Sequence, residues 1–193
     1  MFDDNTAAAP PAWREIDRRS RALGFDMPSE ADTGAMLRLL AASKPGGRLL
    51  ELVTGTGLAT GWLLAGMGQG ASLVSVDRDS TVQAVAREVL GDDPRVTFAI
   101  GDGLDYVRAQ SPGAFDLIFA DAWPGKYEGV DETLALLRPG GLYVVDDMRR
   151  QPNWPQGHQP RVDALAARLK SDPDLATVAL DWASGLVITA RRS

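Results

Sequence analysis

The chain has 193 residues, of which 45% are hydrophobic and 24% are charged, and its formal net charge at pH 7 is −6. The length suffices for one domain with a sizeable core, and the negative charge disfavours nucleic acid and anionic membrane surfaces as partners. The chain contains no cysteine, which excludes disulfides, thiolate metal ligands and a cysteine nucleophile.

The first residues give no sign of export or membrane insertion. Residues 1–4 are acidic where the start of a secretory signal would be basic. No apolar run approaches the ~18 residues needed to cross a bilayer. We therefore expect a cytoplasmic protein.

Helical patterns occupy the N-terminal part of the chain. One runs over residues 11–23, and Ser29 resembles the N-cap of a second helix that reaches about residue 43. We expect a helical segment, residues 1–44, and a core, residues 45–193, to form a single domain.

From residue 48, short apolar segments alternate with helical ones. Strands are predicted at 48–53, 71–76, 95–100, 115–120 and 141–146, and helices near 58–67, 80–90, 103–110 and 128–137. Buried strands separated by helices indicate a parallel sheet covered on both faces.

The end of the chain has a different pattern. A predicted helix near 160–171 precedes apolar runs at 175–182 and 186–191, which Ala183-Ser184-Gly185 joins as an antiparallel hairpin. The predicted fold is therefore a Rossmann-like three-layer α/β sandwich. Its seven-stranded sheet is mostly parallel, with the last strand antiparallel.

A glycine-rich turn follows the first predicted strand. Glu51 stands before it, Gly55 and Gly57 lie within it, and Asp77 ends the next strand. Such a turn lets the backbone approach an adenosine-containing cofactor, and the acid accepts hydrogen bonds from ribose hydroxyls. A nicotinamide fingerprint would need a third glycine at position 60, where the chain has Thr60.

The spacing acid-x-Gly-x-Gly-x-Gly resembles the first motif of class I S-adenosylmethionine-dependent methyltransferases, although Val53 replaces the first glycine. The resemblance continues at Gly101-Asp102-Gly103, at 115–121 and at 137–147. It implies S-adenosylmethionine as cofactor, with the ribose on Asp77. The cofactor-binding residues that it implies are Ser29, Glu51, Thr54, Gly55, Gly57, Asp77, Asp102, Gly103 and Asp121.

Val53 is the clearest departure from this motif. We expect its side chain to crowd the cofactor, so that Val53→Gly tightens binding. We also expect a modest loss of stability, because glycine is unfavourable in a strand.

Three segments resemble the catechol and caffeoyl-coenzyme A O-methyltransferase group, namely 27–29, 115–121 and 144–147. That resemblance implies a divalent cation such as Mg²⁺, which suits carboxylate ligands and would orient and acidify vicinal hydroxyls. The implied ligands are Asp121, Asp146 and Asp147, the last replacing a usual Asn. The alternative is that these carboxylates are solvated or cap a helix.

The base of that group is a lysine three residues after the strand-four acid, but this chain has Pro124 there and Lys126 two residues further on. The only histidine, His158, follows the fifth strand and has a side chain that titrates near neutrality. The candidate catalytic residues are Asp121, Lys126 and His158. Trp123 and Trp154 are candidates for clamping a flat acceptor, with plain packing as the alternative.

The expected activity is methyl transfer to a hydroxyl oxygen of a small molecule. Two alternatives stay open. One is a binding protein that has lost catalysis, as Val53 and Pro124 would allow, and the other is a nicotinamide-dependent oxidoreductase. The sequence identifies neither the acceptor nor the oligomeric state, and a homodimer is left open.

Overall fold

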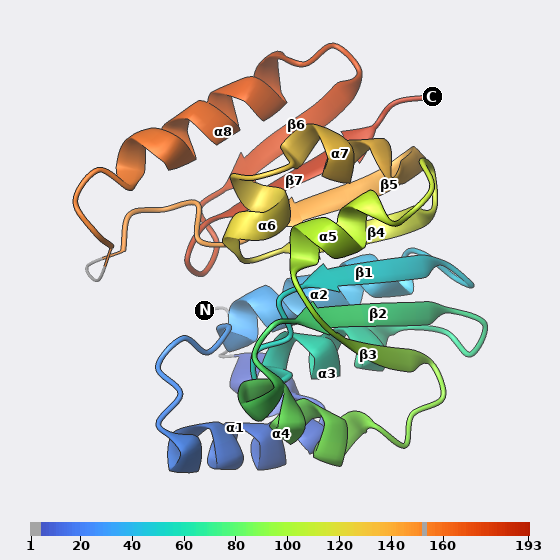
Figure 1. Cartoon of the computed structure of the whole chain (residues 1–193), viewed down its shortest axis with the longest axis vertical. Helices are drawn as coiled ribbons and strands as arrows, with labels where there is room; N and C mark the ends of the chain where they lie inside the picture. Colours follow the sequence, from blue (N-terminus) through green and yellow to red (C-terminus); the bar gives the residue numbers. More distant parts are fainter. Residues whose placement is uncertain (1–4, 152–153) are drawn as a thin grey trace.

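The computed structural model describes residues 5–151 and 154–193 and contains one seven-stranded sheet with the order β3-β2-β1-β4-β5-β7-β6 (Figure 1). β7 is antiparallel to both of its neighbours, and the other neighbouring strands are parallel. The predicted fold class is confirmed. The strands are β1 (Arg48–Leu52), β2 (Ser72–Asp77), β3 (Val96–Ile100), β4 (Phe115–Ala120), β5 (Leu137–Val145), β6 (Leu175–Leu180) and β7 (Leu186–Arg191).

Helices cover both faces of the sheet (Figure 1). The first layer comprises η1 (Asn5–Ala8), α1 (Pro11–Leu23), α2 (Ala31–Ala42), α3 (Leu58–Gly66) and α4 (Ser80–Leu90). The second comprises α5 (Gly103–Arg108), α6 (Trp123–Lys126), α7 (Val130–Ala135) and α8 (Gln159–Ser171). Successive strand residues face opposite layers, so Leu49 packs with α1–α4 and Leu50 with α5–α8. This two-sided burial explains why the central strands are almost entirely apolar.

The strand order changes direction between β1 and β4. Connections on the two sides of this point cover opposite faces, which leaves a crevice beyond the carboxyl ends of the strands. Val53 follows β1, Asp77 ends β2, and Asp121 follows β4. The topology therefore brings together three positions that are distant in the sequence.

The predicted boundaries of two helices, α2 and α7, were among those that were wrong. Helix α2 has Glu30 as its N-cap and makes no side-chain capping bond, so Ser29 does not cap it. The helix predicted at 128–137 is only α7, because β5 begins at Leu137, which pairs with Phe115. Within residues 5–151 and 154–193, every helix is too short or too polar to span a bilayer.

Candidate active site

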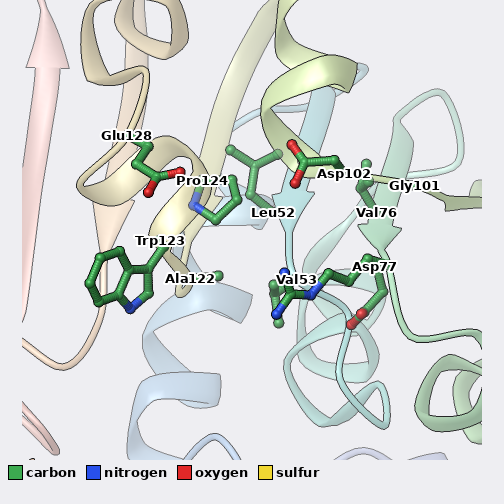
Figure 2. A pocket seen from close by; sticks show the side chains of 12 residues that line it. Leu52, Val53, Val76, Asp77, Gly101, Asp102, Ala122, Trp123, Pro124 and Glu128 are labelled. Carbon is green, nitrogen blue, oxygen red and sulfur yellow. The ribbon is translucent and has the colours of Figure 1, made fainter. Parts of the chain in front are cut away.

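A pocket of ≈ 400 Å³ opens at the carboxyl ends of β1, β2 and β3. Figure 2 shows Leu52 and Val53 between one wall that carries Asp77 and Asp102 and another that carries Trp123. The pocket is within the usual size range of small-molecule sites. The remaining lining residues are Val76, Arg78, Gly101, Gly103, Ala122, Pro124 and Glu128.

The glycine-rich turn between β1 and α3 is fixed by its backbone. Gly57 has a φ of +95°, and a Cβ there would lie 2.6 Å from the Cβ of Ala86 on α4. The N–H groups of Val53 and Thr54 both donate to the carbonyl oxygen of Val76, at 3.0 and 3.1 Å. This sharp turn holds Val53 at a φ of +92°, a region that β-branched residues strongly disfavour.

Asp77 connects the turn to the pocket. Only 7% of its surface is exposed, and its carboxylate accepts bonds from the N–H groups of Gly55 at 2.8 Å and Asp79 at 2.9 Å. A carboxylate offers about four acceptor sites, so Asp77 retains capacity for ribose hydroxyls. The pocket thus has a structured acceptor at the position that the sequence predicted.

Asp102 has a helix-capping role as well as a place in the pocket wall. Its Oδ1 accepts from the N–H groups of Leu104 at 2.8 Å and Asp105 at 3.2 Å, at the start of α5. Gly103 is pressed against the other wall, because a Cβ there would lie 3.1 Å from the Cβ of Pro124. An adenine entering here would meet apolar surface from Leu52, Val76 and Pro124. These residues fit the adenosine part of the cofactor.

Glu51 lies beneath the turn and not in the pocket wall. It is fully buried, and its Oε2 accepts bonds from Thr60 at 2.6 Å and Ser75 at 2.5 Å. Its Oε1 is buried without a partner among the described residues. Burial raises the pKa of Glu51 to about 7, against the opposing hydrogen bonds from Ser75 and Thr60.

Thr54 is likewise turned inward, where its hydroxyl meets Ser75 at 2.6 Å and accepts from Gln83 at 2.9 Å. The sequence analysis did not identify Gln83, a buried α4 residue that also donates to the carbonyl of Ala99 at 3.0 Å. Nor did it identify Arg78 or Glu128 as lining residues, although Arg78 directly follows Asp77. Ser29, Gly55 and Gly57 are not among the lining residues, and their contact with a cofactor stays a prediction.

The predicted carboxylates lie past the ends of β4 and β5. The Oδ1 of Asp121 is buried without a hydrogen-bond partner in the described part of the chain. Burial and then the charge of Asp146 raise the pKa of Asp121 well above its usual value. Asp146 itself accepts from the Ser184 hydroxyl at 2.5 Å and from the N–H of Asp147 at 2.8 Å. Its pKa is raised to about 6, chiefly by burial.

These carboxylates do not assemble into a metal site. Across the two described ranges, no group of three His, Cys, Asp or Glu side chains has an arrangement that could hold a metal ion. The sequence prediction that Asp121, Asp146 and Asp147 share a cation therefore has no support from this geometry and stays a prediction. Asp146 is engaged by Ser184 instead, and Asp147 has a φ of +51°.

A cluster of aromatic side chains borders the same edge of the sheet. The Tyr127 hydroxyl and the His158 Nε2 are 3.1 Å apart, and the His158 ring centroid lies 4.5 Å from that of Trp154. Trp123 packs edge-on against Tyr127 at 5.8 Å, and the Arg161 guanidinium lies 5.0 Å from the Trp123 ring centroid. The two predicted clamp residues therefore contact different members of one group.

The pKa values of this group are set by burial and by nearby charges. Burial first, then Lys126 and Arg161, lower the pKa of His158, so its imidazole is neutral at pH 7. Burial raises the pKa of Tyr127 to about 12, which keeps its hydroxyl protonated. The pair can therefore accept and pass on a proton near neutral pH.

Comparison with known proteins agrees with this geometry. The family described as "Methyltransferase domain" matches residues 50–148, slightly more than half of the chain. A relative named "Catechol O-methyltransferase" from Mycobacterium tuberculosis is 33% identical over 142 residues, which cover 72% of this chain and 64% of the relative.

Solved structures extend the likeness to almost the whole chain. Cofactor-bound Rv0187 from MTB is 26% identical with a TM-score of 0.83, over 95% of this chain and 90% of that one. The O-methyltransferase TomG from Streptomyces achromogenes, in complex with SAM, is 23% identical with a TM-score of 0.79, over 95% and 90%. The chain therefore belongs to the class I S-adenosylmethionine-dependent methyltransferases, among the O-methyltransferases.

Proposed function

We propose that this protein transfers the methyl group of S-adenosylmethionine to a hydroxyl oxygen of a small, flat acceptor. The observation that carries the proposal is that a pocket suited to the cofactor lies next to a rim of aromatic side chains suited to the acceptor. Asp77 and the apolar walls of the ≈ 400 Å³ pocket suit an adenosine, and Trp123, on the wall facing Asp77, packs against Tyr127, whose hydroxyl meets His158. Aromatic faces at that rim suit a planar acceptor.

In this arrangement the cofactor's ribose is held by Asp77 and its adenine lies near Asp102 and Gly103. The methionine part extends over the turn that contains Gly55 and Gly57, with Ser29 as a further contact. Glu51 and Thr54 support the site from beneath the turn, because their hydrogen bonds to Ser75 tie the end of β1 and the turn to β2. Bound S-adenosylmethionine supplies an electrophilic methyl group on a positively charged sulfur.

The acceptor side must remove a proton and hold the resulting oxyanion. The acceptor hydroxyl donates its proton toward Tyr127, whose own proton passes to the neutral His158. An oxygen lone pair then forms the new O–C bond while the C–S electron pair returns to sulfur, leaving S-adenosylhomocysteine. Asp121, whose Oδ1 is buried without a hydrogen-bond partner among the described residues, is the proposed acceptor for a second hydroxyl of the substrate.

The proposal is tested by a transfer assay with S-adenosylmethionine labelled at the methyl carbon. The acceptor panel should contain catechols, simple phenols, aliphatic alcohols, amines and carboxylic acids. We expect labelled ether products from one of the hydroxyl classes and none from the amines. Binding of S-adenosylhomocysteine together with no transfer to any acceptor would instead favour a binding protein that has lost catalysis.

A further inference from the structure

Lys126 is an unusual lysine, because only 4% of its surface is exposed although its side chain ends in an ammonium group. Among residues 5–151 and 154–193, no carboxylate lies within 4.0 Å of that ammonium, and no hydrogen bond of its side chain is found. The ammonium lies over the face of Tyr127, whose ring centroid is 5.3 Å from Nζ. Burying a cation without an ionic or hydrogen-bonding partner is costly, so such a side chain calls for a functional explanation.

The α6 backbone is shaped to bury this lysine. Pro124 and Gly125 are non-helical, and Gly125 has a φ of +81°. A Cβ on Gly125 would lie 2.3 Å from Cδ1 of Leu52, so only glycine fits against β1 here. The turn is held by the Gly125 N–H, which donates to the carbonyl of Glu128 at 2.8 Å, and by the Tyr143 hydroxyl, which donates to the carbonyl of Gly125.

The charge of Lys126 acts on the groups of the acceptor side. It lowers the pKa of Asp121, opposing burial and the repulsion from Asp146, and it also lowers the pKa of His158. An oxyanion placed beside Asp121 and Asp146 would be repelled by both carboxylates unless a cation stood nearby. Lys126 is the buried cation of this edge among the described residues, whose carboxylates form no group that could hold a metal ion.

We propose that the ammonium of Lys126 supplies the positive charge that stabilises the acceptor's oxyanion, in the role that a divalent cation would otherwise fill. The inference rests on the proposed function, since it concerns the same acceptor. In the reaction the acceptor's proton goes to His158 through Tyr127, and the Lys126 ammonium faces the oxygen until the methyl group arrives.

A chromophoric phenol tests this charge without turnover. 4-Nitrocatechol should be titrated from pH 4 to 9 by visible absorbance, with the full chain saturated with S-adenosylhomocysteine and with EDTA present. S-adenosylhomocysteine lacks the positive charge of the sulfonium, so that charge does not contribute to the shift. We expect the wild-type protein to lower the phenol's apparent pKa by at least about one unit.

Three variants separate charge from packing. Lys126→Met should abolish the shift because it keeps the apolar stem without the charge, and Lys126→Arg should retain part of it. Lys170→Met, at an exposed position on α8, should leave the shift intact. Calorimetric affinity for S-adenosylhomocysteine checks that each variant still folds and binds cofactor.

Two other outcomes would contradict the proposal. A shift that survives in Lys126→Met, or that arises only when Mg²⁺ replaces EDTA, would overturn the assignment to Lys126. If the wild-type protein binds S-adenosylhomocysteine but neither catechol nor any other phenol, the proposed acceptor class itself is wrong, and the inference falls with it.

Discussion

Val53 shows how a single backbone angle changes the interpretation of a motif. The sequence predicted a small loss of stability for Val53→Gly on the assumption that residue 53 belongs to the first strand. The structure corrects this, because β1 ends at Leu52 and Val53 has a φ of +92°. Residues held in such regions cost roughly 1–3 kcal/mol each.

We therefore predict that Val53→Gly stabilises the protein by about 1 kcal/mol, after subtracting roughly 0.5–1 kcal/mol for the greater chain entropy of glycine. Binding of S-adenosylhomocysteine should also tighten, because Val53 lines the pocket. Urea unfolding and calorimetry measure the two effects. Val178→Gly, at an exposed position in β6, is the matched control and should destabilise. Equal losses in both variants would refute the strain at Val53.

Asp77 has two partners in the protein and, we propose, further partners in the cofactor. Asp77→Ala should weaken S-adenosylhomocysteine at least about tenfold, because each charge-assisted hydrogen bond contributes roughly 1.5–3 kcal/mol. Some of the loss comes from freeing the N–H of Gly55. The exposed Asp92→Ala is the control for charge alone. Unchanged calorimetric affinity in Asp77→Ala would remove the ribose assignment.

At the scale of elements, Gly57 couples the cofactor turn to helix packing. Gly57→Ala should destabilise by roughly 1–3 kcal/mol through overpacking against Ala86, in addition to the strain of a positive φ. Gly24→Ala shares the strain, with a φ of +72°, but has no atom within 4 Å of the new Cβ. The difference between the two variants in urea unfolding isolates the packing contribution. No difference would mean that α4 moves aside without cost.

The elements also show what sequence patterns can and cannot predict. Apolar runs and glycine turns located all seven strands, because buried strands need continuous apolar residues. The α6 turn was not predicted, since its form depends on Gly125 meeting Leu52, which lies over seventy residues earlier in the chain. For the same reason, the sequence analysis identified Lys126 as a candidate catalytic residue but did not predict that its side chain is buried. A local pattern contains no information about contacts between distant segments.

The site residues also divide into those whose position the sequence predicts and those whose side-chain direction it does not. Asp77, Asp102 and Gly103 line the pocket because strand ends gather at one edge, a rule that sequence order already contains. Glu51 and Thr54 were also expected at the cofactor, but they turn inward because Ser75, Thr60 and Gln83 offer hydrogen bonds there. Side-chain direction at a strand end depends on partners from other elements.

For the whole molecule, the burial of Glu51 predicts a pH dependence of stability. Its folded pKa, about 7, exceeds the ordinary 4.5, so the native state holds the proton more tightly than the unfolded chain does. The resulting stabilisation is fully present below pH 4.5 and is lost as pH rises through 7. Its size is about 3 kcal/mol at most.

Glu51→Gln removes this titration while keeping the shape of the side chain. Unfolding free energies from urea titrations at steps between pH 4.5 and 8 should fall with rising pH more steeply in the wild-type protein than in the variant. Parallel profiles would mean that Glu51 is ionised in the native state throughout this range.

The oligomeric state is a separate question. A homodimer stays a prediction, and analytical sedimentation would measure the mass of the assembly in solution.

The central claim is that the pocket beyond β1, β2 and β3 holds S-adenosylmethionine. Isothermal titration of the wild-type chain with S-adenosylhomocysteine, and separately with NADH, tests it most directly. We predict saturable binding of one S-adenosylhomocysteine per chain and no detectable heat with NADH. Binding of NADH with equal or greater affinity, or no binding of S-adenosylhomocysteine at all, would contradict the account.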